Sequence, residues 1–285
     1  MEDKKTIIYI MSNQRSGSTL IENILSKSPQ IVSIGESFLL GGYIHKTGPG
    51  SSCNWTCSCG DSLDDCTFWN SVYQRLNISN AREIKNTKIV YPKGKDIDYQ
   101  KEQNEDVRSL MNLIYKAFFD ITDCDVLVDS SKEAFYGVSL YQNSPYTFKF
   151  IYLKRDLRAV TLSKHKWRKK YNKKNIGLIK LILANYRHRL QCKLMLRKVD
   201  KEDVFNLSYE EFFKDPQLVL NQMSDFFGFK TFDMPEFMEL SNDHTIAGTP
   251  NRFKKRRIQY DDQWENDSKK RPFFNALGFM LNKLG

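Results

Sequence analysis

Short, largely apolar runs alternate with longer amphipathic segments along most of the chain. Each short run is rich in β-branched or aromatic residues, as expected of a buried strand. Strands that alternate with helices predict a parallel sheet with helical crossovers. We therefore expect an α/β fold with a P-loop-like central parallel sheet flanked by helices, in a single domain over residues 1–285. The strand candidates are residues 6–11, 31–34, 125–128, 148–153 and 204–207.

The segments between these runs place apolar side chains at helical spacing. Two other stretches break the alternation. Residues 93–106 are polar and charged, so we expect them to connect elements on the surface. Residues 41–70 contain an insertion rich in glycine, serine and cysteine, which predicts a lid that leaves the core and covers a site. The helix candidates are residues 20–25, 107–118, 157–169, 176–197 and 216–227.

The charge balance narrows the class of partner. The 285 residues carry a formal net charge of +10, which favours an anionic partner such as a nucleotide, a nucleic acid or a membrane surface. No apolar run approaches the roughly 18 residues of a membrane span, and the N-terminus shows no signal-peptide pattern. These features predict a soluble, cytoplasmic protein. A basic run at residues 164–170 could contact nucleic acid, but such a run is more often a solvated helix face.

Polar residues follow the carboxyl ends of four predicted strands, where ligands bind in open α/β sheets. The first is a hydroxyl-rich turn at residues 12–19, which suits a phosphate at the start of a helix. An ordinary serine-capped turn is the alternative. The turn lacks the spacing of an ATP-binding P-loop, because Gly17 is its only glycine and Ser18 stands where the lysine is required. The other polar ends are residues 129–132, Arg155 and Tyr209.

Two motifs resemble those of sulfotransferases that use 3′-phosphoadenosine 5′-phosphosulfate (PAPS). The sequence Arg15-Ser16-Gly17-Ser18-Thr19-Leu20 resembles the loop that binds the 5′-phosphosulfate. Residues 150–163 resemble the element that grips the 3′-phosphate, which implies this role for Arg155 and Ser163. An arginine fork suits a phosphate, although an arginine beside an aspartate, here Asp156, is more often a surface ion pair.

The first of these motifs also indicates a branch of the family. Arg15 and Leu20 stand where cytosolic steroid- and phenol-type members have a lysine and a tryptophan. The resemblance is therefore closer to bacterial, tyrosylprotein and carbohydrate-type members. It also implies that no tryptophan at position 20 stacks on the adenine.

The resemblance implies chemical roles for two residues at other strand ends. Glu36 corresponds to a glutamate that removes the proton of the acceptor, with His45 as the second candidate base. Lys132 corresponds to a lysine that supports the transferring group as charge builds on the leaving phosphate. Without the resemblance, Glu36 would be a capping or ion-paired residue and Lys132 a solvated lysine.

Two further donor contacts are implied nearer the C-terminus. Tyr209 corresponds to a tyrosine that touches the adenine, although a position in the core is the alternative. Arg252, with residues 254–257 as weaker candidates, belongs to a basic loop that closes over the donor. This loop lies in a C-terminal closing segment, residues 240–285.

Four of the six cysteines crowd into the predicted lid. Their spacing fits no zinc ribbon, and a structural zinc ion is the alternative to a lid that carries free thiols, which we favour. Catalysis itself is expected to need no metal. The four residues are Cys53, Cys57, Cys59 and Cys66.

The resemblance as a whole implies an enzyme that transfers a sulfuryl group from PAPS to an acceptor hydroxyl on a small molecule, sugar or peptide. The product of the donor is adenosine 3′,5′-bisphosphate. Arg15, Lys132 and the loop at residues 16–19 would stabilise charge on the phosphosulfate. Two alternatives are a P-loop nucleotide kinase and a non-catalytic protein that binds a nucleotide or nucleic acid.

Overall fold

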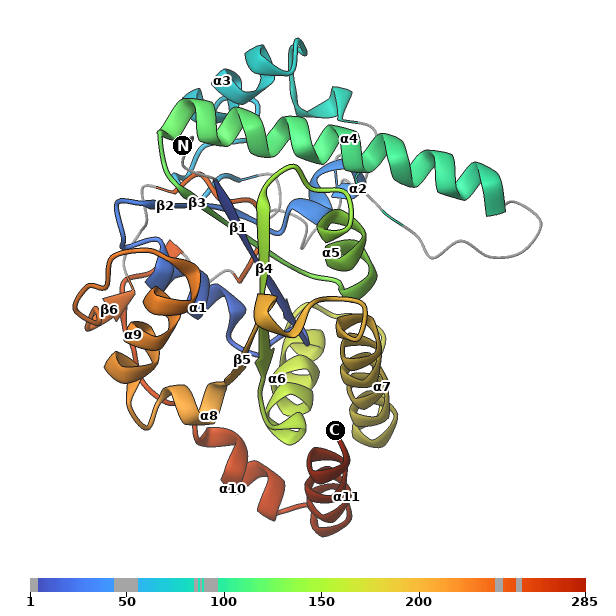
Figure 1. The fold of residues 1–285 in the computed structure, drawn as a ribbon. Coiled ribbons are helices and arrows are strands. Elements are labelled where there is room, and N and C mark those ends of the chain that lie inside the picture. The colour runs from blue at the N-terminus through green and yellow to red at the C-terminus, as the bar shows by residue number, and fades with distance from the viewer. Residues whose placement is uncertain are drawn as a thin grey trace.

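The fold is built around a five-stranded, entirely parallel sheet (Figure 1). The structure is a computed structural model that describes residues 5–43, 56–84, 87, 89, 97–238, 243–249 and 253–285. All five predicted strands are confirmed, and the α/β fold with them. In spatial order the strands are β2 (Ile31–Gly35), β3 (Val126–Lys132), β1 (Thr6–Ser12), β4 (Thr147–Lys154) and β5 (Val204–Ser208).

Helices connect the strands and cover both faces of the sheet. Among the described residues, short 3₁₀ segments lie at Ser37–Leu39, Ala81–Glu83 and Lys201–Asp203. A small antiparallel pair, β6 (Phe237–Met238) with β7 (Arg256–Arg257), lies outside the main sheet. The helices are α1 (Ser18–Leu25), α2 (Leu40–Tyr43), α3 (Thr67–Arg75), α4 (Ile97–Thr122), α5 (Ala134–Tyr141), α6 (Leu157–Lys170), α7 (Leu178–Leu196), α8 (Tyr209–Phe212), α9 (Pro216–Phe227), α10 (Gln263–Lys269) and α11 (Pro272–Leu284).

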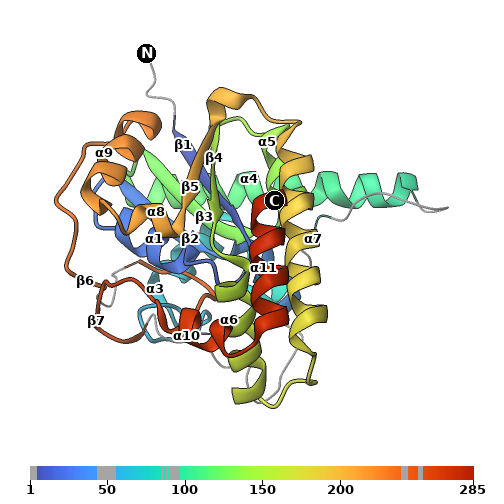
Figure 2. The same ribbon diagram turned by 90° about the horizontal axis from the view of Figure 1, so that it is seen from below.

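The polar segment before residue 107 differs from the expectation. Residues 97–106 form the first turns of α4 and are not an irregular surface connection. This end of α4 extends beyond the sheet in both ribbon views (Figures 1 and 2). Most of its described side chains are partly or fully exposed, so the helix there needs no apolar stripe. The same polarity explains why its apolar spacing begins only near Val107.

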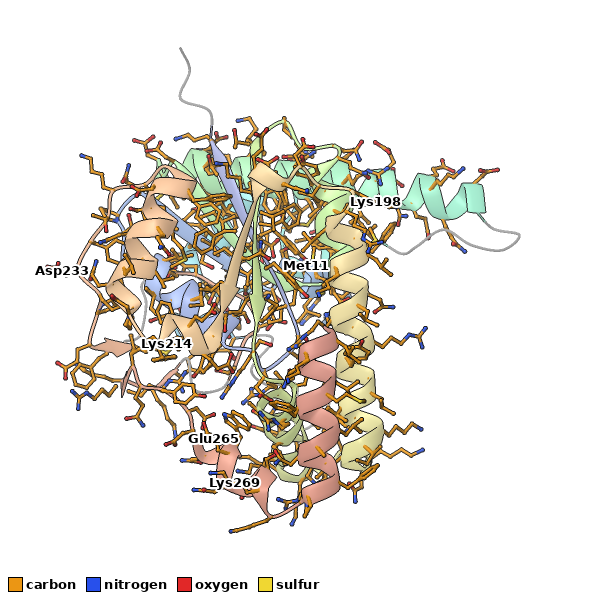
Figure 3. All side chains as sticks on the ribbon, turned by 60° about the horizontal axis from the view of Figure 1, so that its bottom comes forward. Met11, Lys198, Lys214, Asp233, Glu265 and Lys269 are labelled. Carbon is orange, nitrogen blue, oxygen red and sulfur yellow. The ribbon has the colours of Figure 1, made fainter. Side chains whose placement is uncertain are left out.

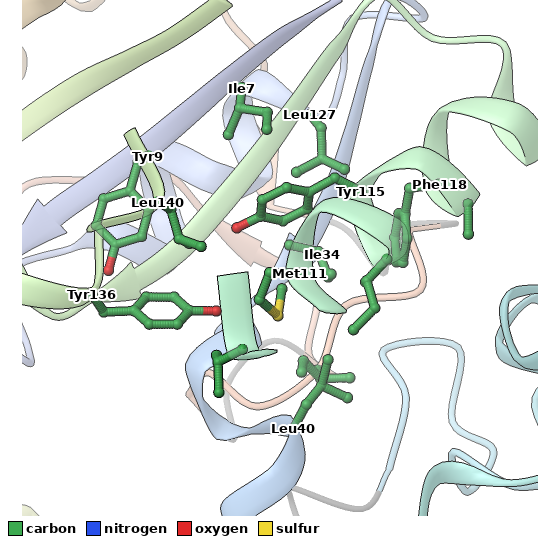
Figure 4. Packing of buried hydrophobic residues seen from close by; sticks show 14 of the residues in the cluster. Ile7, Tyr9, Ile34, Leu40, Met111, Tyr115, Phe118, Leu127, Tyr136 and Leu140 are labelled. Atoms are coloured by element: carbon green, nitrogen blue, oxygen red, sulfur yellow. The ribbon is translucent and has the colours of Figure 1, made fainter. Parts of the chain in front are cut away.

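The continuous apolar run of β1 follows from burial on both faces. Ile7, Tyr9 and Met11 point to one side, where α3, α4 and α5 complete a core that includes the buried rings of Tyr115 and Phe118 (Figure 4). The alternate residues of β1 point to the opposite side and pack beneath α1, α8 and α9. A parallel strand covered on both faces has no polar face to present to water.

A third apolar cluster joins the C-terminal helices to the sheet domain. Helices α6, α7, α10 and α11 share the buried side chains of Leu157, Ile182 and Trp264, and α11 runs beside α7 in both ribbon views (Figures 1 and 2). Figure 3 shows the contrast between the interior and the surface. Met11 lies within the sheet, whereas Lys214 is at the surface. Among the helices of the described residues, none is both long enough and apolar enough to cross a membrane.

The strand register brings the polar ends of the strands to the same edge of the sheet. Met11 of β1 pairs with Lys132 of β3, and Ser12 pairs with Leu153, just before Arg155. Gly35, which precedes Glu36, pairs with Asp129. The residues predicted to act together therefore follow neighbouring strands.

Candidate active site

The loop between β1 and α1 has the backbone shape of a binding turn. Arg15 has a φ of 73° and Gly17 a φ of 97°, so both lie in the left-handed region. A Cβ atom on Gly17 would lie 2.7 Å from the ring of Tyr209, so only glycine fits there. No side chain of the described residues caps the first turn of α1, which starts at Ser18. The positive end of this helix dipole is therefore not met by a capping oxygen.

Ser16 lies at the centre of this loop. Its side chain is 1% exposed, and its Oγ has no hydrogen-bond partner among the described residues. A buried hydroxyl without a partner is costly, and such groups are often satisfied by a ligand or water. Ser16 therefore points to a polar ligand within the loop.

Arg15 and Ser163, which come from the two separate motifs, are in direct contact. The Arg15 Nε donates to Ser163 Oγ at 3.1 Å. Arg155 is 7% exposed, and one of its NH groups reaches the backbone oxygen of Arg15 at 3.4 Å. The structure thus brings both predicted phosphate-binding motifs to one place.

Arg155 also has two contacts that the sequence did not indicate. Its guanidinium forms an ion pair of 2.9 Å with Asp261, and it lies over the Tyr209 ring, 4.2 Å from the centroid. Asp156 does not take this place, because it caps α6 and pairs with Arg158 at 2.6 Å. The alternative of a surface pair between Arg155 and Asp156 is therefore not what the structure contains.

Positive charge is concentrated at this site. Burial lowers the pKa of Arg15, and the neighbouring cations Arg155 and Arg256 lower it further, whereas Asp261 acts in the opposite direction. Arginines crowded together in a partly buried position repel one another, and an anion of high charge would relieve that repulsion. Arg256 comes from the basic run at residues 254–257, which the sequence ranked below Arg252.

Glu36 and Lys132 form a second cluster at the same edge of the sheet. The Lys132 Nζ lies 2.8 Å from Glu36 Oε1, and the two side chains are only 7% and 17% exposed. Lys132 has a φ of 72° and also donates to the Ser130 oxygen at 2.9 Å. A left-handed conformation is strained for a lysine, and such strain is often found at functional sites. The alternative that Lys132 is merely a solvated lysine does not fit this geometry.

The segment at residues 243–249 fixes the backbone at Glu36. The Glu36 N–H donates to the Ile246 oxygen at 3.1 Å, and Gly35 and Ile246 form a parallel bridge. A Cβ atom on Gly35, which has a φ of 82°, would lie 2.2 Å from that oxygen. Glycine is therefore required immediately before the candidate base.

Glu22 is a member of this region that the sequence analysis missed. It is 5% exposed and accepts from Ser130 Oγ at 2.8 Å and from Ser33 Oγ. Burial raises its pKa to about 7, while the two serine hydrogen bonds and Lys132 partly offset that rise. Helical spacing gave no signal for it, because Glu22 lies off the face formed by the apolar residues at positions 20, 21, 24 and 25.

Asp129, the other carboxylate near the site, braces the structure. It is fully buried and accepts hydrogen bonds from Tyr115 at 2.7 Å, from the Ser131 N–H at 2.9 Å and from Ser37. Burial raises its pKa. The hydroxyl of Tyr136 lies 3.1 Å from Ser37 as well. This network fixes Ser37, the residue after Glu36.

The remaining predicted residues have different environments. Tyr209 is 5% exposed and packs against Phe213 and Tyr260, which is the environment of a core residue. Leu20 is buried in the core beneath α1. Ser18 is also buried, and Thr19 is half-buried. Arg252, His45 and Cys53 lie outside the described residues.

Comparison with known proteins finds one family model that matches part of the chain. Residues 139–275 match the sulfotransferase domain. This part of the chain is similar to sulfotransferases. The matched region includes Arg155, Ser163 and Tyr209, whereas the residues of the first loop, Glu36 and Lys132 precede it. In sequence, no curated protein matches the chain.

Solved structures show the same fold over most of the chain. The sulfotransferase domain from the curacin biosynthetic pathway is 17% identical, with a TM-score of 0.54, and the match covers 93% of this chain and 90% of that one. The sulfotransferase domain from the Synechococcus PCC 7002 olefin synthase is 18% identical, with a TM-score of 0.52 and coverage of 93% and 89%. The match over residues 139–275 agrees with the predicted resemblance to sulfotransferases, and the solved structures show the fold of sulfotransferase domains. A nucleotide kinase is not favoured.

Proposed function

We propose that this chain is a sulfotransferase that moves a sulfuryl group from PAPS to an acceptor hydroxyl. The observation that supports it most is the contact between Arg15 and Ser163, which joins the two phosphate-binding motifs beside Arg155. PAPS carries phosphate groups at both ends of its ribose, so it needs two anion sites close together. The loop at residues 15–19 suits the 5′-phosphosulfate, and Arg155 with Ser163 suits the 3′-phosphate.

The Asp261 carboxylate pairs with Arg155 at the position where the 3′-phosphate of the donor is proposed to bind. Its Oδ2 lies 2.9 Å from Arg155, and its side chain is 49% exposed. An exposed ion pair is worth little, so a phosphate with more negative charge can displace it from the guanidinium. The 3′-phosphate of the donor would then bind the Arg155 guanidinium, which the chain already holds in position.

Glu36 is the proposed general base. Its carboxylate takes the proton of the acceptor hydroxyl, and the acceptor oxygen forms a bond to sulfur as the bond from sulfur to the 5′-phosphate oxygen breaks. Once Glu36 is protonated, its ion pair with Lys132 weakens, which leaves the lysine charge for the departing phosphate. Lys132 can contact both the Glu36 carboxylate and the departing phosphate, because its strand neighbour Met11 leads into the phosphosulfate loop.

As proposed, the charge of the transition state is met by fixed groups of the chain. Arg15 and Lys132 supply cations, and the start of α1 supplies backbone N–H groups and a helix dipole. Catalysis by positioning and electrostatics is sufficient in the related chemistry of phosphoryl transfer. In this scheme no step depends on a metal ion.

The test of the proposed function is a panel of acceptors incubated with radiolabelled PAPS. Phenols, sugars and tyrosine peptides cover the acceptor classes, and ATP labelled in its terminal phosphate is the control donor. We expect label to pass from PAPS to at least one hydroxyl acceptor, with no transfer from ATP. Label that passes only from ATP would instead support the kinase alternative.

A further inference from the structure

Four potential metal ligands meet where the lid region packs against the chain near Glu36. Cys57, Cys59 and Cys66 belong to the lid region, whereas His244 comes from the segment at residues 243–249. Their ligand atoms all lie within 4.8 Å of one another. Cys57 and Cys66 are buried, His244 is half-buried, and Cys59 is at the surface. The predicted set of four cysteines is thereby changed, because Cys53 lies outside the described residues and a histidine completes the group.

Three of the distances between these atoms are close to those of a tetrahedral zinc site. With Zn–S near 2.3 Å and Zn–N near 2.0 Å, the edges of the tetrahedron are about 3.8 Å between two sulfurs and about 3.5 Å between sulfur and nitrogen. The Cys59 and Cys66 sulfurs are 3.7 Å apart. The His244 Nδ1 lies 3.5 Å from the Cys57 sulfur and 3.2 Å from that of Cys66. The other pairs of ligand atoms lie within 4.8 Å of one another.

The chain holds this group in place by contacts that do not involve the ligand atoms. The Gly60 N–H donates to the Cys57 oxygen at 2.9 Å, which closes a tight turn and brings Cys59 back beside Cys57. Trp69 Nε1 donates to the backbone oxygen of His244 at 2.8 Å. The Phe68 ring stacks on the imidazole, with the centroids 4.6 Å apart and an interplanar angle of 1°. The imidazole is thus oriented by the helix that follows Cys66.

We propose that Cys57, Cys59, Cys66 and His244 bind one structural zinc ion. The three thiols release their protons to solvent as they bind, which is usual for zinc sites. All four positions are filled by protein, so the ion has no open position for catalysis. The site differs from the donor site in both residues and chemistry.

The position of this ion gives it an effect on the active site. His244 lies two residues before Ile246, whose oxygen accepts from the Glu36 N–H. Ser58, between two of the cysteines, donates its N–H to Thr245 at 3.1 Å. The zinc ion would therefore fasten the lid to the segment that fixes the candidate base. This consequence rests on the proposed function of Glu36, whereas the metal site itself does not.

A disulfide is the competing use of these cysteines. The sulfurs of Cys59 and Cys66 are 3.7 Å apart, compared with about 2.05 Å in a disulfide. A disulfide between any two of them would leave the third thiol and His244 without a role. The presence of a histidine nitrogen within 3.5 Å of two sulfurs favours a metal ion over a disulfide.

Metal content decides between these uses without any measurement of activity. The whole protein is purified without added metal and without chelators, and its metal content is measured by inductively coupled plasma mass spectrometry. We expect one zinc ion per chain that survives dialysis, and a cobalt-exchanged protein with the thiolate-to-cobalt absorption of a tetrahedral site. Metal-free protein that cannot be loaded with zinc or cobalt would overturn the proposal, as would an intact disulfide among these residues.

Variants locate the ion. Cys59→Ser, at an exposed position, and His244→Ala should each lose bound zinc or bind it at least about ten-fold more weakly. Cys124→Ser is the matched control, because Cys124 lies outside the cluster, and it should retain the full content. Full zinc retention in Cys59→Ser and His244→Ala would place the metal elsewhere and contradict the assignment. If zinc is bound but its removal leaves turnover unchanged, only the link to Glu36 fails.

Discussion

Lys132, the last residue of β3, and Glu36, which follows β2, form an ion pair of 2.8 Å with little exposure to water. The pair connects the end of β3 with the end of β2, and Lys132 also lies beside Met11 at the end of β1. The candidate base is thereby held near the loop that is proposed to bind the phosphosulfate. Its partner Lys132 is a cation whose ion pair with Glu36 weakens when the carboxylate takes a proton.

Replacement of Glu36 should separate chemistry from binding. In Glu36→Gln the side chain keeps its size but cannot accept the proton of the acceptor, so turnover should fall by about 100-fold or more. Affinity for adenosine 3′,5′-bisphosphate should stay within a few-fold of the wild type. Glu202→Gln, at an exposed position, is the control and should leave both unchanged. Undiminished turnover in Glu36→Gln would mean that another group is the base, and Asp129 is too deeply buried to take that part.

Arg155 and Asp261 should respond to replacement in opposite directions. Arg155→Ala removes a charge-assisted contact and should weaken the binding of adenosine 3′,5′-bisphosphate by about 10- to 100-fold. Asp261→Asn removes a competing carboxylate and should strengthen it by up to about five-fold. Calorimetric titration measures both affinities. Weaker binding in Asp261→Asn would show that Asp261 supports the nucleotide and does not stand in for it.

Gly35 should tolerate no side chain. In Gly35→Ala the new Cβ would lie 2.2 Å from the Ile246 oxygen at a φ of 82°, so we expect a loss of about 1–3 kcal/mol in the free energy of unfolding. Gly177→Ala is the matched control, because its φ is −58° and a Cβ there would meet nothing within 4 Å. Denaturant unfolding of both variants compares them. Equal stability of the two would contradict the close approach of residues 243–249 to β2.

Glu22 should make stability depend on pH. Burial raises its pKa from an ordinary 4.5 to about 7, so the folded protein binds this proton more tightly than the unfolded chain does. The stabilisation is therefore complete below the unfolded pKa and is lost as pH rises through the folded one. Relative to Glu22→Gln, the wild type should lose on the order of 2 kcal/mol in the free energy of unfolding between about pH 5 and pH 8. A difference that does not vary with pH would show that Glu22 remains ionised.

The sequence predicted the strands and the residues at their ends for a simple physical reason. Strands buried on both faces are apolar throughout, so their ends are visible where polar residues begin, as at Ser12 and Arg155. In a parallel sheet those ends share one edge, and the contact between Arg15 and Ser163 agrees with that expectation. The strand ends were predicted to within one residue except that of β3, where the polar residues 129–132 are still within the strand.

The parts that the sequence did not predict depend on contacts between distant segments. His244 lies 178 residues from Cys66, and no local spacing connects a lone histidine with a cysteine cluster. Nothing in the sequence distinguishes Asp261 from a surface aspartate, because its contact with Arg155 depends on the path of the chain. The polar turns at the start of α4 have no apolar stripe, so helical spacing could not be seen there.

Ligand discrimination by the wild-type protein tests the central claim most directly. Calorimetric titration compares adenosine 3′,5′-bisphosphate, ADP and single-stranded DNA at one salt concentration. Because Arg15, Arg155 and Ser163 form adjoining sites for two phosphate groups, we expect adenosine 3′,5′-bisphosphate to bind at least about ten-fold more tightly than ADP. Single-stranded DNA should bind more weakly than either nucleotide. Equal or tighter binding of ADP would contradict the assignment of a 3′-phosphate site, and with it the proposal that PAPS is the donor.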